Sequence, residues 1–205
     1  QALIIEKVCP NQKKFGLPLK AIKKAIMYLQ SQTIMKFHST LRFFLVFSIC
    51  LLLSAYTSIN QERMEQGLSF LQLQDYNSAL IEFTNEIKVN PDNASAYNYR
   101  GVVKAKQGDF DGSLSDYDMS ISLESNKGEA FANRGIARAR TGDLEGAISD
   151  FNKAILLEPT NGNSYFNHGM AMEMISDMPS ACNDWEKADS LGFKQANTFV
   201  RQKCE

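Results

Sequence analysis

Few residues of the chain have the types and spacing that catalysis or metal binding requires. Beyond residue 58 the only histidine is His168, and no HExxH pair of metal ligands occurs. The sequence also contains no paired CxxC motif, no GxxxxGK phosphate loop and no GxSxG nucleophile elbow. The many carboxylates fall at recurring positions, where helix capping and surface exposure account for them. We therefore expect no enzymatic activity, no cofactor, no metal site and a structural role for His168.

Cysteines are the other candidate reactive groups. Four are present, and only Cys182 and Cys204 follow residue 58. If an N-terminal leader is removed on export, these two remain, and an even number in an oxidising compartment indicates a disulfide. The bond would close a loop of about 22 residues and contribute roughly 3 kcal/mol to stability. The alternative is a buried Cys182 and a free Cys204.

Charge divides the chain near residue 58. Residues 1–58 hold eight Lys/Arg and one acidic residue, a net charge of +7. From Met35, a basic segment with Lys36 and Arg42 precedes an apolar run over 43–55, as in a secretory signal peptide. The run is shorter than the roughly 20 residues of a spanning helix, so a permanent anchor is the weaker alternative. We interpret residues 35–58 as a signal peptide and Cys50 as part of its apolar run, in preference to a lipid-attachment site.

The segments on either side of this leader differ in character. Residues 1–34 include a basic amphipathic stretch that suits a membrane surface, but they precede a complete leader and lack an initiating Met. We interpret them as an upstream extension outside the natural protein. Residues 59–205 hold 14 Lys/Arg and 22 Asp/Glu, a net charge of −8, which argues against a nucleic-acid partner.

This acidic segment repeats with a period of 34 residues. Glycines recur at that interval, at Gly67, Gly101, Gly135 and Gly169. An aromatic residue lies 16 positions after each glycine, at Phe83, Tyr117, Phe151 and Trp185. An aspartate lies eight positions after each, at Asp75, Asp109, Asp143 and Asp177. Columns that share one period indicate an array of four repeated units. Because small residues let two packed elements approach closely, we expect Gly101 to face Ser113, with the aromatic rings filling the gap to the next unit.

Short turns set the expected helix boundaries. Gly108 and Gly142 suit the positive φ of a helix C-cap, and the aspartate after each suits the N-cap of the next helix. We expect helices over residues 61–73, 77–89, 95–107, 111–124, 129–141, 145–157, 163–175 and 179–190. The segment 196–205 has apolar residues at helical spacing, and we expect it to cap the exposed end of the array.

These columns resemble those of the tetratricopeptide repeat family. The matching features are small–aromatic pairs such as Ala79 and Phe83, the spaced glycines, and Pro91 and Pro159 at the ends of units. The resemblance implies an all-α fold, a right-handed α-solenoid of helix-turn-helix repeats with a C-terminal capping helix. Its four units would span residues 60–93, 94–127, 128–161 and 162–195.

The resemblance also implies a concave groove that binds a peptide or protein partner. Asn133 and Asn167 match asparagines that hydrogen-bond a bound peptide backbone in similar proteins, because an amide both donates and accepts. The other expected groove residues are an aromatic residue, an apolar stripe and two bases: Tyr99, Val102, Ile136, Met170, Lys106 and Arg140. The alternative is that these side chains belong to the core or to a solvated surface. Glu65 and Glu173 would oppose an acidic partner.

Two further columns vary together. The residue before the glycine is Arg100 or Arg134 in the units where Asp116 or Asp150 stands fifteen residues after it. We therefore predict an Arg100–Asp116 and an Arg134–Asp150 ion pair between the two helices of one unit. The alternative is an exposed face with unrelated charges.

Together these features predict a non-catalytic scaffold for protein–protein interaction, exported to the bacterial periplasm or cell envelope. The alternatives are a membrane-anchored or cytoplasmic adaptor and a regulatory subunit of a larger complex. Contact with a membrane is expected only if the leader is retained.

Overall fold

The computed structural model describes Ser48 and residues 62–205. The chain divides into two compact units, Gln1–Arg63 and Met64–Glu205, and the second contains the repeats. Apart from Ser48, the expected leader over 35–58 lies outside the described residues, as do the upstream stretch over 1–34 and Cys50. The described part of the chain is helical without strands, and none of its helices is long and apolar enough to cross a membrane.

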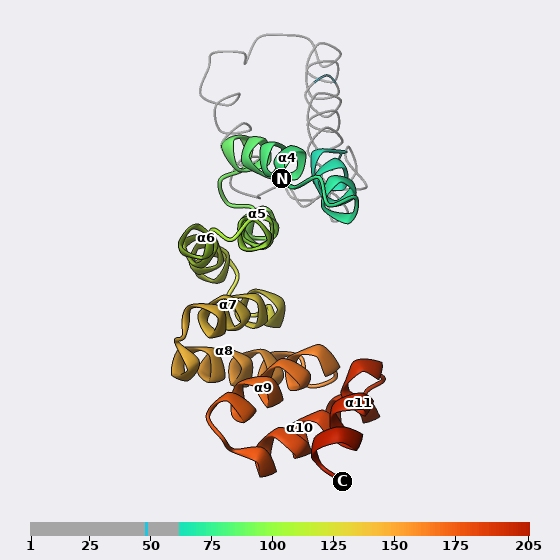
Figure 1. Ribbon diagram of the computed structural model, residues 1–205. Helices are drawn as coiled ribbons and strands as arrows, with labels where there is room; N and C mark the ends of the chain where they lie inside the picture. Colours follow the sequence, from blue (N-terminus) through green and yellow to red (C-terminus); the bar gives the residue numbers. More distant parts are fainter. Residues whose placement is uncertain (1–47, 49–61) are drawn as a thin grey trace, which may run out of the picture. The chain divides into compact units, whose positions relative to one another are not determined.

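Helices follow one another as a stack of antiparallel hairpins (Figure 1). Helical residues 62–72 precede eight helices, namely α4 (Tyr76–Val89), α5 (Ala94–Lys106), α6 (Phe110–Leu123), α7 (Gly128–Thr141), α8 (Leu144–Leu157), α9 (Gly162–Met174), α10 (Met178–Ser190) and α11 (Lys194–Lys203). The tightest pairs are α5 with α6, α7 with α8 and α9 with α10. The end of the first helix at residue 72 and the bounds of α4 to α10 lie within one residue of those expected from the 34-residue period. This arrangement is an all-α solenoid.

The turns inside the hairpins owe their uniform shape to the aspartate column. The carboxylates of Asp109 and Asp143 each accept a hydrogen bond of 2.9 Å from a backbone N–H three residues later, as helix N-caps do. Gly108 and Gly142 precede them with φ of 86° and 89°, the left-handed conformation that glycine adopts without strain. The outer two hairpins make the same turn with non-glycine residues, Gln74 and Ser176, also at positive φ.

The glycine column admits an aromatic ring into each hairpin. A Cβ atom placed on Gly101 would lie 2.7 Å from the Tyr117 ring, closer than real Cβ atoms approach other groups. That ring belongs to the residue one helical turn after Ser113, the residue that we expected Gly101 to face. The rings also reach the next hairpin, since Phe83 stacks on Tyr99 with ring centroids 5.7 Å apart.

Substituting Gly135 with alanine should therefore destabilise the protein, by about 1–3 kcal/mol, since the methyl group would overlap a packed ring. Its Cβ would lie 2.8 Å from the ring of Phe151, which is 1% exposed. Without such a neighbour, the same change in a helix stabilises by roughly 0.5–1 kcal/mol. Urea unfolding measures the sign. In a double-mutant cycle with Phe151→Ala the losses should be less than additive, and strict additivity would contradict the overlap.

The last helix continues the repeat register as the first helix of a fifth unit. Phe199 falls in the aromatic column four residues before the glycines, and Lys203 falls in the glycine column itself. The Phe199 ring contacts Phe166 of α9 and Trp185 of α10, with centroids 5.0 and 5.2 Å apart. α11 begins at Lys194, two residues before the expected cap, and it covers the apolar end of the α9–α10 hairpin.

Candidate functional site

The first helices of consecutive hairpins approach one another more closely than the second helices do. α5 contacts α7 and α7 contacts α9. Among these described hairpins, no comparably close contact joins α6 to α8 or α8 to α10. A stack of helix pairs assembled in this way curves, with the first helices on its inner side. We call the inner face of α5, α7 and α9 the groove.

The two asparagines expected to bind a peptide both lie on these helices and already have partners. Nδ2 of Asn133 donates to Oδ1 of Asn98, across from α7 to α5, over 3.0 Å. Nδ2 of Asn167 donates to the backbone and side-chain oxygens of Asn163, at 2.9 and 3.0 Å. The sequence analysis did not identify Asn98 as a groove residue. Its position next to Tyr99, which is in the column of Asn133, could have suggested an amide pair between the two helices. The hydrogen bonds fix the orientation of both amides, and each Oδ1 accepts no hydrogen bond from a described residue.

The expected apolar groove residues contribute to packing. Ile136 lies against the buried cluster of Ala147 and Phe151, and Met170 lies against the cluster around Trp185. Tyr99 stacks on Phe83, and burial together with the nearby charge of Glu129 raises its pKa. All three side chains are only partly buried, as is that of Val102. The floor of the groove is therefore the outer layer of the hydrophobic core.

Some charged residues of the groove form ion pairs within the protein and others do not. Lys106 and Arg140 are exposed at corresponding positions of α5 and α7, and neither has an ion-pair partner in the part of the chain that the structure describes. Glu173 of α9, by contrast, is paired with Lys203 of α11. The opposition to an acidic partner expected from Glu173 is therefore reduced by its pairing, while the two free bases remain available.

Both predicted ion pairs are present between the helices of one unit. Arg100 lies 2.6 Å from Asp116, and Arg134 lies 2.7 Å from Asp150, each through two hydrogen bonds. These hydrogen bonds to a carboxylate raise the pKa of both guanidinium groups. The covariation of the two columns thus predicted direct contacts.

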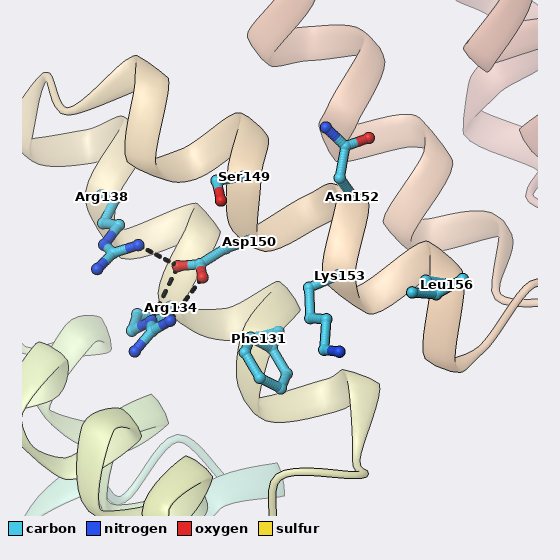
Figure 2. A pocket seen from close by; sticks show the side chains of 8 residues that line it. All are labelled: Phe131, Arg134, Arg138, Ser149, Asp150, Asn152, Lys153 and Leu156. Atoms are coloured by element: carbon cyan, nitrogen blue, oxygen red, sulfur yellow. Dashed lines mark hydrogen bonds and ion pairs between the residues drawn. The ribbon is translucent and has the colours of Figure 1, made fainter.

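Each pair also belongs to a larger network that the sequence analysis missed. A second base one turn further along the first helix, Lys104 or Arg138, contacts the same aspartate at 2.8 or 2.9 Å. Arg134 additionally contacts Asp118 of the preceding unit at 2.6 Å. Figure 2 shows Arg134 and Arg138 converging on Asp150. The four-residue spacing of the bases could have indicated the second contact, since such residues share a helix face.

His168 takes the place of the arginine in the fourth unit. Its Nδ1 lies 2.6 Å from the Asp184 carboxylate, the same pair of columns as in the two preceding units. The side chain is buried, and its Nε2 has no hydrogen-bond partner among the described residues. No group of three or more potential metal ligands gathers within that described part. The geometry of His168 is that of an inter-helix contact.

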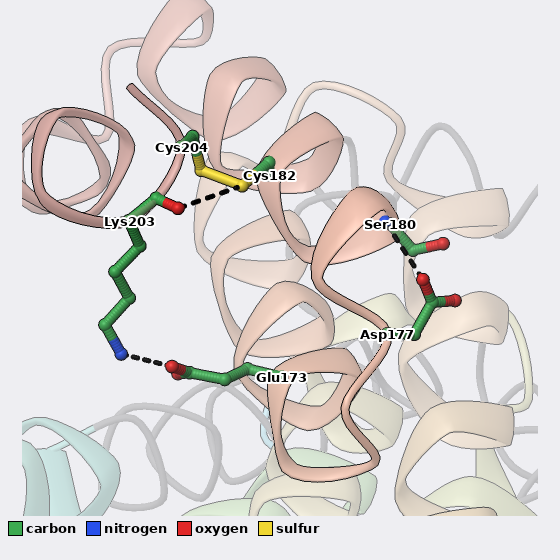
Figure 3. Close-up of a disulfide and its surroundings, with 6 residues drawn as sticks. All are labelled: Glu173, Asp177, Ser180, Cys182, Lys203 and Cys204. Carbon is green, nitrogen blue, oxygen red and sulfur yellow. Dashed lines mark hydrogen bonds and ion pairs between the residues drawn. A yellow bond between two sulfur atoms is a disulfide. The ribbon is translucent and has the colours of Figure 1, made fainter.

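A disulfide fastens the last helix to the array (Figure 3). It joins Cys182 of α10 to Cys204, the residue that follows α11, with Cα atoms 5.7 Å apart. The Lys203 ammonium group lies 5.7 Å from the Trp185 ring centroid and 5.3 Å from that of Phe199, in addition to its ion pair with Glu173. Covalent, ionic and aromatic contacts therefore hold α11 in place.

Family models for the tetratricopeptide repeat match residues 64–123 and 128–161. A search of curated proteins found no match. The fold is similar to that of MamA from Desulfovibrio magneticus RS-1, with 21% identity over 66% of this chain and 77% of that chain, at a TM-score of 0.59. It is also similar to pilF of Pseudomonas aeruginosa, with 19% identity over 64% of this chain and 60% of that chain, at a TM-score of 0.61.

A third solved structure with this fold contains a bound peptide. It is the first TPR of Spaghetti (RPAP3) bound to the HSP90 peptide SRMEEVD, with 21% identity over 57% of this chain and 93% of that chain, at a TM-score of 0.55. Repeats of this family are generally non-catalytic scaffolds for protein–protein interaction. The two family matches and the stacked hairpins identify the chain as a tetratricopeptide repeat protein.

Proposed function

We propose that the chain binds an extended segment of a partner protein along the groove. The observation that carries this proposal is the serial contact of α5, α7 and α9, which aligns Tyr99, Asn133 and Asn167 in one column. An oriented amide every 34 residues can accept from, and donate to, the backbone of an extended chain. The RPAP3 complex with SRMEEVD supports the proposal, because a protein of the same fold holds a short peptide.

The partner is expected to be neutral or basic overall. The repeat segment carries a net charge of −8, which favours association with a partner of the opposite sign. Lys106 and Arg140 supply two free bases at one edge of the groove, where a single carboxylate of the partner could lie.

The proposed location is the bacterial cell envelope. The leader-like residues 35–58 support export, and the Cys182–Cys204 disulfide suits an oxidising compartment. The alternative is a membrane-anchored or cytoplasmic adaptor, or a regulatory subunit of a larger complex. Cell fractionation distinguishes these locations: the proposal requires the protein in the periplasmic fraction, and recovery in the cytoplasm would contradict it.

Replacing Asn133 and Asn167 together with alanine should reduce capture of the partner from envelope extracts about tenfold or more, because two backbone hydrogen bonds are lost. The amount of partner retained by immobilised protein is measured by quantitative mass spectrometry. Asn183→Ala is the matched control, since it removes an exposed amide from α10, outside the groove.

Thermal unfolding of each variant separates loss of binding from loss of fold, which matters because Asn133 also bonds Asn98. Undiminished capture by a folded Asn133→Ala/Asn167→Ala variant would dismiss the groove as the binding surface.

A further inference from the structure

Met174 places an exposed apolar side chain in the groove. It lies on α9, in the column that holds Lys106 and Arg140 in the two preceding units. Seven large hydrophobic side chains of the described residues are exposed, and Met174, at 56%, is the one that lies on the first helix of a hairpin. The other six belong to second helices or to the turns inside the hairpins. The groove therefore changes from basic to apolar along this column.

Met174 is part of a larger apolar surface on α9. Asn167, Met170 and Met174 are spaced i, i+3 and i+7, so they lie on one face of the helix. Met170 is partly exposed and lies against the buried cluster around Trp185. Ile175, the next residue along the chain, is 48% exposed. The surface thus combines a thioether that is anchored on the core with apolar atoms that are open to a ligand.

The charge beside this surface is compensated within the protein. Between residues 167 and 175 of the described chain, Glu173 is the one acidic or basic residue apart from His168. Lys203 of α11 forms an ion pair with Glu173, and His168 is buried in its contact with α10. Arg140 lies on the adjacent inner helix, at an interaxial distance of about 8–10 Å. An apolar group can therefore cover Met174 without burying an unpaired charge of α9.

The packing of the hairpins does not explain a methionine at this position. The same column holds Gln72, Lys106 and Arg140 in the other three units, so polar side chains are compatible with the fold there. A thioether side chain is unbranched, flexible and polarizable, and it adapts its shape to different apolar partners. The pair Met170 and Met174 therefore suits a large apolar side chain better than a charged one.

We propose that Met170 and Met174 form a subsite of the groove that binds one large apolar side chain of the partner, namely leucine, methionine or phenylalanine. This inference rests on the proposed binding of an extended segment along the groove. Asn167 lies on the same face of α9, so a segment whose backbone it holds would place a nearby side chain on the two methionines. Backbone contacts accept any sequence, and the subsite adds selection for an apolar residue.

The test uses the full chain and two fluorescein-labelled, amidated peptides, KSTSTSLSTSTSK and KSTSTSSSTSTSK, with fluorescence anisotropy. Both peptides are basic, as expected of the partner, and they differ only in the central residue. Six extended residues on each side span about 20 Å. That length equals two spacings of about 8–10 Å between inner helices, so the peptide reaches α5 in either direction of binding. We expect the serine peptide to bind about tenfold more weakly, because it lacks the leucine side chain that the subsite covers.

Met174→Gln should abolish most of this preference, since it replaces the thioether with a polar side chain of similar length. We expect it to weaken binding of the leucine peptide about fivefold and to leave the affinity for the serine peptide within about twofold. Met174→Leu keeps the surface apolar and should retain the preference. Met119→Gln is the matched control, since Met119 is an exposed methionine of α6, outside the groove. It should change neither affinity.

Three results would overturn the proposal: no binding of the leucine peptide to the unaltered protein at millimolar concentration, equal affinity of the two peptides, and equal weakening by Met119→Gln and Met174→Gln. The Asn133→Ala/Asn167→Ala variant tests the groove separately and should weaken binding of both peptides. If that variant binds normally while Met174→Gln removes the leucine preference, the groove proposal fails and the apolar subsite stands. The reverse pattern removes the subsite and leaves the groove.

Discussion

Replacing Asp150 with alanine is expected to lower the free energy of unfolding by about 2–4 kcal/mol. Asp150 is 3% exposed and accepts hydrogen bonds from both Arg134 and Arg138. Removal of the carboxylate would leave two partly buried guanidinium groups without their shared counter-charge. The loss is greater than the net contribution of the ion pairs, because most of it is the desolvation of the remaining charges. Urea unfolding followed by circular dichroism measures it.

Asp118→Ala is the matched control for this prediction. Asp118 contacts the same Arg134 at a similar distance, but its side chain is 60% exposed. Exposed ion pairs contribute little, so the expected loss is below about 1 kcal/mol. If the two alanine variants lost equal stability, burial would not explain the importance of Asp150.

Reduction of the Cys182–Cys204 disulfide is expected to destabilise the last hairpin and α11 by about 3 kcal/mol, from the entropy that the closed loop removes from the unfolded chain. Trp185 is the single tryptophan of the chain, is fully buried and packs against Phe199 of α11. Its emission should therefore shift to longer wavelength at lower urea concentration in the reduced protein. The measurement is a pair of urea titrations with and without reductant.

The variant Cys182→Ala/Cys204→Ala separates this bond from the other cysteines of the chain. It should unfold like the reduced protein, and reductant should have no further effect on it. Identical Trp185 titrations for oxidised and reduced protein would show that packing alone holds α11.

The sequence predicted the backbone of the repeats closely, because the aspartate caps and glycine turns are local signals. The Arg134–Asp150 contact could also be predicted from the sequence, since the residue before each repeat glycine and the residue fifteen after it vary together. What the sequence did not show is the direction of the aromatic side chains. The rings were expected to fill the gap to the next hairpin, but the Tyr117 ring also lies against Gly101 within its own hairpin.

The environment of the groove residues was harder to predict from the sequence, for a related reason. A column in a repeat identifies equivalent positions, but it does not show which of those side chains contact a neighbouring residue of the same protein. Ile136 therefore packs on the core, and Asn133 bonds Asn98, although both lie on the inner helices. The pocket that Figure 2 shows, between α7 and α8, combines side chains from two helices, and no spacing within one segment of the sequence indicates it.

The lysine in the glycine column has a consequence for self-association. In the four preceding units that position is a glycine, and the aromatic ring of the following helix occupies the space where a side chain would lie. On α11 the position holds Lys203. Its ammonium group forms an ion pair with Glu173 and cation–π contacts with the rings of Trp185 and Phe199. A ring from another molecule therefore has no place to enter, and the solvent side of α11 presents only polar groups such as Gln195, Thr198 and Arg201. Solenoids with uncovered ends can add copies head to tail into open filaments. In this protein α11 covers one end of the array with polar groups, and the disulfide holds that helix in place.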